Sequence, residues 1–214
     1  MSDFLQGYPL LAPGQTFCFG CHPEISCFNS CCADLDLVLS PYDVLRLRKA
    51  LGISALEFLE RHAEVGVPPD NGPPQVLLKM SEDGNRTCPF VSEPGCTIYP
   101  DRPSACRTYP LGRGASLDSQ GQVTCRYILV REDHCHGFGE SKTWTAEEWF
   151  KDQGLQDYNV FNDRYLRLTT AWRKTGRRLT RDQFSQVLND LYQADDLEAA
   201  LEKVEGYLLC GSAD

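Results

Sequence analysis

Five cysteines lie within the sixteen residues from Phe17 to Cys32, and this stretch most constrains what the chain can fold into. They are Cys18, Cys21, Cys27, Cys31 and Cys32. A single thiol can be buried as a small apolar group, but five thiols in one short segment cannot all be core residues. The stretch has neither helical nor strand periodicity. We therefore expect a loop whose sulfurs bind a metal or an inorganic cluster, or form disulfides.

The composition favours metal binding over disulfides. A net charge of −9 argues against general attraction to nucleic acid or to anionic membranes, and we expect neither as a partner. The sequence has no apolar run long enough to span a bilayer and no recognisable secretory signal, which predicts a cytoplasmic protein. Thiols in a reducing cytosol stay free or bind metal, and the odd count of 11 cysteines fits a closed set of disulfides poorly.

Capping residues mark the helices. Ser40, followed by Pro41 and Asp43, predicts a helix that ends at Gly52. Ser54 with Glu57 predicts a second one, with Leu56, Phe58 and Leu59 on its buried side. Similar signals predict four helices in the last third: one that begins at Thr145, one across 157–175, one that begins at Thr180 and one across 196–209. Short strands are expected at 34–39, 75–80 and 122–131.

A second cysteine group lies between residues 88 and 110. It contains Cys88, Cys96 and Cys106 together with five prolines, which exclude a continuous helix and favour a stiff loop. Further along, Cys135 stands between two histidines and ahead of two glycines. The flanking histidines, His134 and His136, are either alternate ligands or surface side chains.

The vicinal pair Cys31–Cys32 bears on the choice of metal. Structural zinc sites use separated cysteine pairs, because adjacent cysteines can hardly both bind one tetrahedral ion without strain. Adjacent thiolates reach two metal atoms of a cluster more easily, and iron–sulfur clusters are held by cysteines alone. We therefore favour an iron–sulfur cluster, with zinc as the alternative.

These motifs resemble those of the YkgJ-type cysteine-cluster family of zinc- or iron-chelating domains. The resemblance covers about residues 17–140 and is carried by the pair Cys31–Cys32, the segment LSPYDVLRLRKALG, CPF at Cys88, GCTIYPDRPSACRTYP and CHGFG at Cys135. The spacing departs from the common C-x2-C-x2-CC pattern, because Cys27 lies four residues before Cys31 and Cys21 lies six before Cys27.

The resemblance implies a ligand set of eight thiolates, which suits one large centre or two 4Fe-4S clusters. The implied ligands are Cys21, Cys27, Cys31, Cys32, Cys88, Cys96, Cys106 and Cys135. Cys18 and Cys125 could replace a ligand of this set, and Cys210 is not expected to bind the metal. Arg102 and Arg107 either donate hydrogen bonds to the cluster sulfurs or fix the loop.

We expect an α+β fold, mostly helical, in which a loop-rich cysteine core with few short strands is wrapped by helices. Residues 1–140 would form the metal-binding domain and residues 141–214 a helical extension packed on it. The expected function is binding of an iron–sulfur cluster for electron transfer, redox sensing or cluster handling, with an unidentified redox or protein partner. The alternatives are a structural zinc module that binds other proteins and a metal-dependent modifying enzyme; the sequence does not decide whether the protein is an enzyme.

Overall fold

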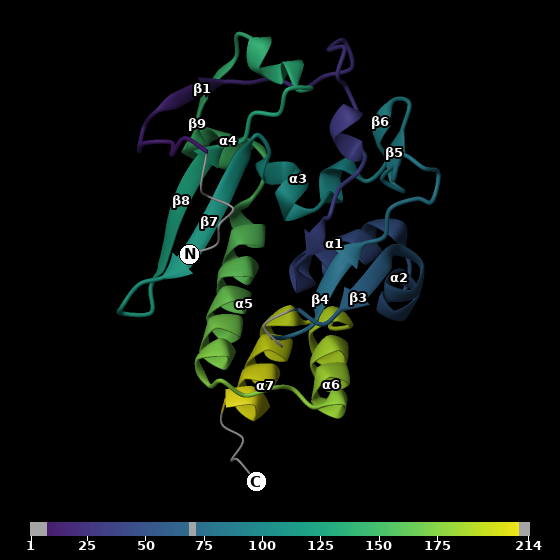
Figure 1. Ribbon diagram of the computed structural model, residues 1–214, viewed down its shortest axis with the longest axis vertical. Coiled ribbons are helices and arrows are strands. Elements are labelled where there is room, and N and C mark those ends of the chain that lie inside the picture. Colours follow the sequence, from purple (N-terminus) through teal and green to yellow (C-terminus); the bar gives the residue numbers. More distant parts are fainter. Residues whose placement is uncertain (1–7, 69–71, 210–214) are drawn as a thin grey trace. The chain divides into compact units, whose positions relative to one another are not determined.

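The computed structural model of the chain describes residues 8–68 and 72–209. Within them, seven α-helices accompany nine short strands, which pair antiparallel in four small sheets (Figure 1). This confirms the α+β class. The chain divides into two compact units: unit 1 comprises residues 1–35 and 80–157, and unit 2 comprises residues 36–79 and 158–214. The expected domain boundary at residue 140 stays a prediction.

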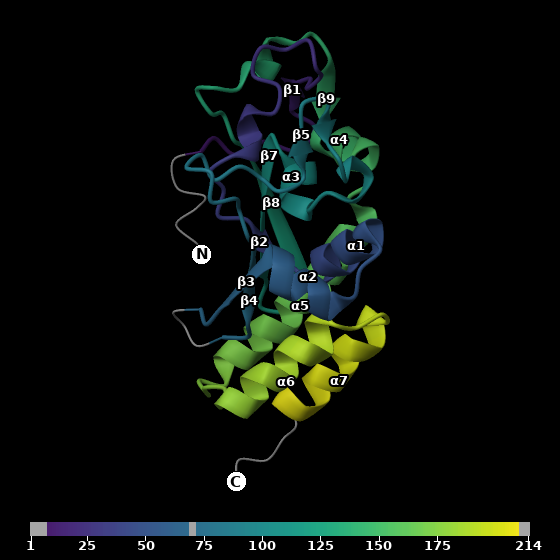
Figure 2. The ribbon, with the colours of Figure 1, turned by 90° about the vertical axis from the view of Figure 1, so that its right-hand side faces the viewer.

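Unit 2 combines a three-stranded sheet of order β2-β4-β3 with five helices. Its elements are β2 (Val38–Leu39), α1 (Pro41–Leu51), α2 (Ala55–His62), β3 (Ala63–Gly66), β4 (Gln75–Leu78), α5 (Gln156–Lys174), α6 (Arg181–Tyr192) and α7 (Leu197–Leu209). Figure 2 shows α6 and α7 packed side by side.

The helices of unit 2 begin and end where the capping signals predict. The Ser40 hydroxyl accepts a hydrogen bond from the Asp43 N–H, and the Asp43 carboxylate accepts one from the Ser40 N–H at 2.8 Å. This reciprocal pair satisfies two N–H groups that α1 itself leaves unpaired. Gly52 ends α1 with a φ of 66°, in the left-handed region that glycine enters without a steric cost.

The core of unit 2 is formed by apolar side chains from its sheet and helices. Trp172 and Tyr158 of α5 are each 1% exposed, and Phe58 of α2 is fully buried. The buried stripe of α2 contains Ala55, Phe58 and Leu59, at the spacing of one helix face. The expectation that Leu56 is also buried was wrong: Leu56 lies off this stripe and is 55% exposed.

Unit 1 is built from three two-stranded pairings, short helical turns and one capped helix. Its elements are β1 (Thr16–Cys18), η2 (Ser30–Cys32), β5 (Val91–Ser92), β6 (Gly95–Cys96), η3 (Tyr99–Asp101), α3 (Ser104–Thr108), β7 (Leu111–Leu117), β8 (Val123–Leu129), η4 (His136–Gly139), β9 (Thr143–Thr145) and α4 (Ala146–Asp152). β1 pairs with β9 and places Phe17 opposite Trp144, and β7 forms a long hairpin with β8 (Figure 1).

An aromatic core holds unit 1 together. Phe17, Phe19, Leu111, Leu129, Trp144 and Trp149 are all less than 10% exposed and form one cluster. The indole N–H of Trp144 donates to the Phe19 carbonyl at 2.9 Å, so this ring is fixed by both apolar and polar contacts. Cys135 packs against the same cluster. The core therefore reaches one of the predicted ligands directly.

The strands are shorter than predicted. Of the stretch 34–39 only Val38–Leu39 pairs, and the strand expected at 75–80 ends at Leu78. The strand expected at 122–131 is present as β8. The other strands, β1, β3, β5, β6, β7 and β9, were not predicted, because the partners of such short strands set their conformation more than local propensity does.

Candidate metal centre

The first cysteine group folds as a strand end, a run of turns and one 3-10 turn. Cys18 ends β1, Cys21 precedes the turns, Cys27 lies inside them, and Cys31 and Cys32 occupy η2. Asn29, just before η2, has a φ of 69°, a conformation that asparagine adopts more readily than most residues. Its side-chain amide donates to the Ser92 carbonyl at 3.0 Å. The first group is thereby tied to the β5–β6 hairpin of the second.

Backbone hydrogen bonds place the vicinal pair beside the second group. The Cys88 N–H donates to the Cys32 carbonyl at 2.8 Å, and the Asp34 N–H donates to the Arg86 carbonyl at 3.0 Å. Between these two bonds, Ala33 and Thr87 face each other in a single β-bridge. Residues 32–34 and 86–88 thus form a short antiparallel ladder with Cys32 and Cys88 on neighbouring segments.

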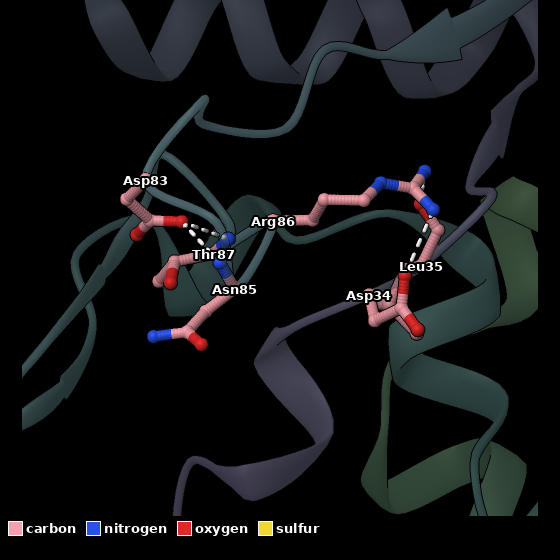
Figure 3. A network of polar contacts seen from close by, with 6 residues as sticks. All are labelled: Asp34, Leu35, Asp83, Asn85, Arg86 and Thr87. Atoms are coloured by element: carbon pink, nitrogen blue, oxygen red, sulfur yellow. Dashed lines mark hydrogen bonds and ion pairs between the residues drawn. The ribbon is translucent and has the colours of Figure 1, made fainter.

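A network of side chains surrounds this ladder (Figure 3). The Arg86 guanidinium pairs with the Asp34 carboxylate at 2.8 Å and donates to the Leu35 carbonyl at 3.4 Å. The Asp83 carboxylate accepts hydrogen bonds from the backbone N–H groups of Asn85 and Thr87 and so shapes the turn before Cys88. Hydrogen bonds from Thr87 are the main reason why the pKa of Asp83 falls to about 2. This carboxylate is therefore ionised, as its role in the turn requires.

The second group follows as a hairpin and two helical turns. Cys88 lies just before β5, Cys96 is in β6 opposite Val91, and Cys106 is in α3. Within the described residues, the helical segments of this proline-rich stretch are the three residues of η3 and the five of α3, so no continuous helix runs through it, as predicted.

Arg102 and Arg107 are both buried and fix this loop. Arg102 donates to the Tyr99 carbonyl at 2.7 Å and to the Gln153 side chain, and its guanidinium lies 3.7 Å from the centre of the Tyr99 ring. Arg107 donates to the carbonyls of Arg102, Gln153 and Pro100. These bonds go to oxygen rather than sulfur. The charge of Arg102 nevertheless partly offsets the rise in the pKa of Cys21 and Cys96.

A close approach of two backbone segments connects the first group with Cys135. The Gly20 N–H donates to the Gly137 carbonyl at 3.0 Å, and the His136 N–H donates to the Cys27 sulfur at 3.1 Å. A Cβ on Gly137 would lie 2.5 Å from the Gly20 oxygen, so only glycine fits there. Nδ1 of His136 bonds to the Ser26 hydroxyl at 2.7 Å. The histidine thus uses one ring nitrogen to fix the turn.

Thiols around Cys21 act on one another electrostatically. The pKa of Cys21 is raised to about 11, first by burial and then by the charges that its neighbouring thiols carry when ionised. Those neighbours are Cys31, Cys27 and Cys135. Cys21 would therefore remain protonated at neutral pH unless a cation offset its charge.

In the vicinal pair, a hydrogen bond between the two thiols shifts their pKa values in opposite directions. A hydrogen bond from the Cys32 thiol lowers the pKa of Cys31 to about 7, and the same bond, followed by burial, raises the pKa of Cys32 far above its ordinary value. Cys88 and Cys106 add to the rise at Cys32. Burial also raises the pKa of Cys88 and Cys96, and Cys31 adds to both.

The remaining cysteines lie apart from these interactions. Cys125, on β8, accepts a hydrogen bond from Arg113 at 3.0 Å, and the Cys18 sulfur is 3.8 Å from the Thr143 hydroxyl. Cys210 lies outside the described residues. Within residues 8–68 and 72–209, no three Cys, His, Asp or Glu side chains are already arranged around one point as ligands. The structure brings the predicted thiols into electrostatic contact, and the ligand set stays a prediction.

Tyr109 is a functional candidate that the sequence analysis did not identify. Its hydroxyl is buried and has no hydrogen-bond partner of normal geometry within the described part of the chain. Burial is the main reason that its pKa is raised, and the Cys135 side chain adds to the rise. The position of Tyr109 three residues after Cys106 was the available signal, but a tyrosine near a cysteine is common in cores.

The donor set fits a thiolate-bound cation. Half-buried thiols repel one another when ionised, and a metal ion between them would remove that penalty. The Tyr109 hydroxyl would also gain an acceptor, because a metal-bound thiolate accepts hydrogen bonds better than a thiol does. Fold and site together define a cysteine-rich, metal-binding α+β protein.

Comparison with family models supports the same class. Residues 20–149 match the CxxCxxCC model, described as a putative zinc- or iron-chelating domain. The match covers more than half of the chain, which therefore belongs to this family. Searches of curated proteins and of solved structures found no match. No helix in the described parts of the chain has the length and apolar character needed to cross a membrane.

Proposed function

We propose that unit 1 binds an iron–sulfur cluster through cysteine thiolates, for electron transfer, redox sensing or cluster handling. The observation that carries the proposal is the position of the vicinal pair: Cys31 and Cys32 share one 3-10 turn, and Cys88 is hydrogen-bonded beside them. Sulfurs on adjacent residues can bind different irons of a cluster, whereas a single tetrahedral zinc would strain them.

The character of the neighbouring groups also supports a cluster. The electrostatic partners of Cys32 are thiols: Cys31, Cys88 and Cys106. Iron–sulfur clusters are ligated by thiolates, while zinc and single iron ions also accept imidazole and carboxylate. The thiols around Cys32 therefore favour iron and sulfide over a mixed-ligand metal, while Glu132 and His134 also act on the pKa of Cys31.

Anaerobic purification with analysis of iron, acid-labile sulfide and zinc tests the proposal. We expect a brown protein with iron and sulfide in equal amounts. Stoichiometric zinc without iron or sulfide would overturn the proposal and favour a structural zinc module, the alternative that the family description also covers.

Single substitutions test the vicinal pair. We expect Cys31→Ser and Cys32→Ser each to lower the iron and sulfide content, because serine is a poor ligand for these irons. Cys125→Ser is the matched control, since Cys125 bonds to Arg113 on the β7–β8 hairpin instead of to the clustered thiols. If either vicinal variant kept full iron content and an unchanged spectrum, that cysteine would not be a ligand.

A further inference from the structure

The position of Tyr109 is fixed by the aromatic core of unit 1. Tyr109 follows α3 directly, and its ring meets the Phe19 ring edge-on, with the ring centres 5.8 Å apart. Tyr109 and Cys135 both pack against the aromatic core cluster, although they are distant in the sequence. The core thus contacts both the phenol of Tyr109 and a predicted metal ligand.

The hydroxyl of Tyr109 is in an unusual state for a buried polar group. Most such groups have a hydrogen-bond partner, and leaving one unpaired is destabilising. In the described part of the chain, this hydroxyl has no partner of normal geometry. The side chain with which it interacts most strongly is Cys135, and the charges of Glu132 and Cys31 act on it from further away. A thiol is a weak acceptor, so it satisfies the hydroxyl poorly.

We propose that the Tyr109 hydroxyl donates a hydrogen bond to the Cys135 sulfur when Cys135 binds the metal, which makes Tyr109 a positioning residue of the centre. The inference rests on the proposed metal-binding function. The proton stays on the tyrosine oxygen, and no group is transferred. The bond withdraws charge from the thiolate and holds the Cys135 side chain in one orientation, as outer-shell partners of metal ligands do.

The turn that carries Cys135 needs such a fixed partner. Cys135 is followed by η4, whose residues His136 and Gly137 are bonded to Cys27 and Gly20. Both bonds are made by backbone atoms of the turn, and neither involves the Cys135 side chain. A hydrogen bond from Tyr109 would restrict the rotation of that side chain.

The test compares Tyr109→Phe with Tyr207→Phe. Tyr207 of α7 also has a buried hydroxyl without a partner of normal geometry, and its neighbour is Asp190 instead of a thiol. Both variants remove one buried hydroxyl, so a general effect on packing would appear in both. Full-length protein is stripped of metal and titrated with Co²⁺, whose thiolate charge-transfer bands report sulfur donor strength, and with Zn²⁺ in competition with a chelator.

We expect Tyr109→Phe to bind Zn²⁺ about 10-fold more weakly and to shift the Co²⁺ charge-transfer bands to longer wavelength, because the thiolate has lost a hydrogen bond. Tyr207→Phe should match the wild type in both measurements. In a Cys135→Ser background, Tyr109→Phe should have no further effect. Equal spectra and affinities for the wild type and Tyr109→Phe would overturn the inference.

A second measurement tests the same hydrogen bond without removing the Tyr109 hydroxyl. Protein made with meta-fluorotyrosine carries a stronger hydroxyl donor on a ring of nearly the same size, so the Co²⁺ bands should move to shorter wavelength; unmoved bands would contradict the inference. Failure of the proposed function would look different: wild-type protein would contain zinc without iron or sulfide, and the Tyr109 comparison would still apply, or it would bind neither Co²⁺ nor Zn²⁺ and have no metal site at all.

Discussion

Substitution of Gly137 by alanine should separate the first cysteine loop from Cys135. The added methyl group would lie 2.5 Å from the Gly20 carbonyl oxygen and 2.7 Å from a ring carbon of Phe19. Neither neighbour can yield easily. Phe19 is 3% exposed within the aromatic core, its carbonyl accepts from Trp144, and its N–H donates to the Lys142 carbonyl at 2.9 Å. The turn that contains residue 137 must therefore move instead.

The expected cost follows from two contributions. Overpacking of a well-packed site costs about 1–3 kcal/mol, and loss of the hydrogen bond between the Gly20 N–H and the Gly137 carbonyl adds about 1 kcal/mol. A total of about 2–4 kcal/mol corresponds to a fall in Tm of roughly 5–15 °C for a chain of this size. The displaced turn also carries the bond from the His136 N–H to the Cys27 sulfur, so metal content should fall as well.

Gly139→Ala is the matched control, because it lies two residues away in the same turn. A Cβ at Gly139 meets no heavy atom within 4 Å, and the backbone there does not need glycine. This variant should keep its metal and should have an unchanged or slightly higher Tm. Calorimetry gives the Tm of both variants, and metal analysis gives their metal content. If Gly137→Ala were indistinguishable from Gly139→Ala, the close approach of residues 20 and 137 would not hold the two loops together.

Three further predictions concern the thiols, the metal and unit 2. In metal-free protein at pH 7, Cys31 should react with iodoacetamide roughly 100-fold faster than Cys21. The pKa of Cys31 is about 7, so about half of this thiol is ionised, whereas the pKa of Cys21 is about 11 and very little of it is ionised. A thiolate of lower pKa is a weaker nucleophile, which offsets part of the difference in rate. Equal rates in peptide mass spectrometry would contradict this. Removal of the metal should increase hydrogen exchange in unit 1 more than in unit 2, because ligation contributes folding free energy where the chain is rich in loops; equal protection would argue against it. Arg48→Met should lower the free energy of unfolding, measured by urea titration, by about 1–2 kcal/mol. The reason is the hydrogen bond that the Arg48 guanidinium donates to the Ala194 carbonyl at 2.8 Å. An unchanged urea midpoint would show that this hydrogen bond does not stabilise unit 2.

Local signals in the sequence predicted the helices well. The pairs Ser40–Asp43 and Thr145–Glu148 form reciprocal caps in the structure, as their spacing indicates. The pairing of β1 with β9 was not predicted, because Phe17 and Trp144 are 127 positions apart and no local pattern links them. The ladder that places Cys32 beside Cys88 was missed for the same reason.

The site was predictable in its chemistry but not in its arrangement. Clustered cysteines and the family resemblance identified the thiols, because residue type alone specifies soft donors. The role of the buried arginines was left open by the sequence, and Arg107 illustrates why: its bonds go to backbone carbonyls of a loop whose course the sequence does not reveal. The unpartnered hydroxyl of Tyr109 is likewise a property of the packed core alone.

The contacts arrange the thiols in two neighbourhoods that meet at one residue. Cys21, Cys27 and Cys135 are brought together by the approach of residues 20 and 137, while Cys32 and Cys88 are brought together by the ladder between residues 32–34 and 86–88. Cys31 acts on the pKa of members of both sets, Cys21 in the first and Cys88 in the second. A hydrogen bond from Cys32 also lowers the pKa of Cys31. Cys31 is therefore the thiol at which the two neighbourhoods join.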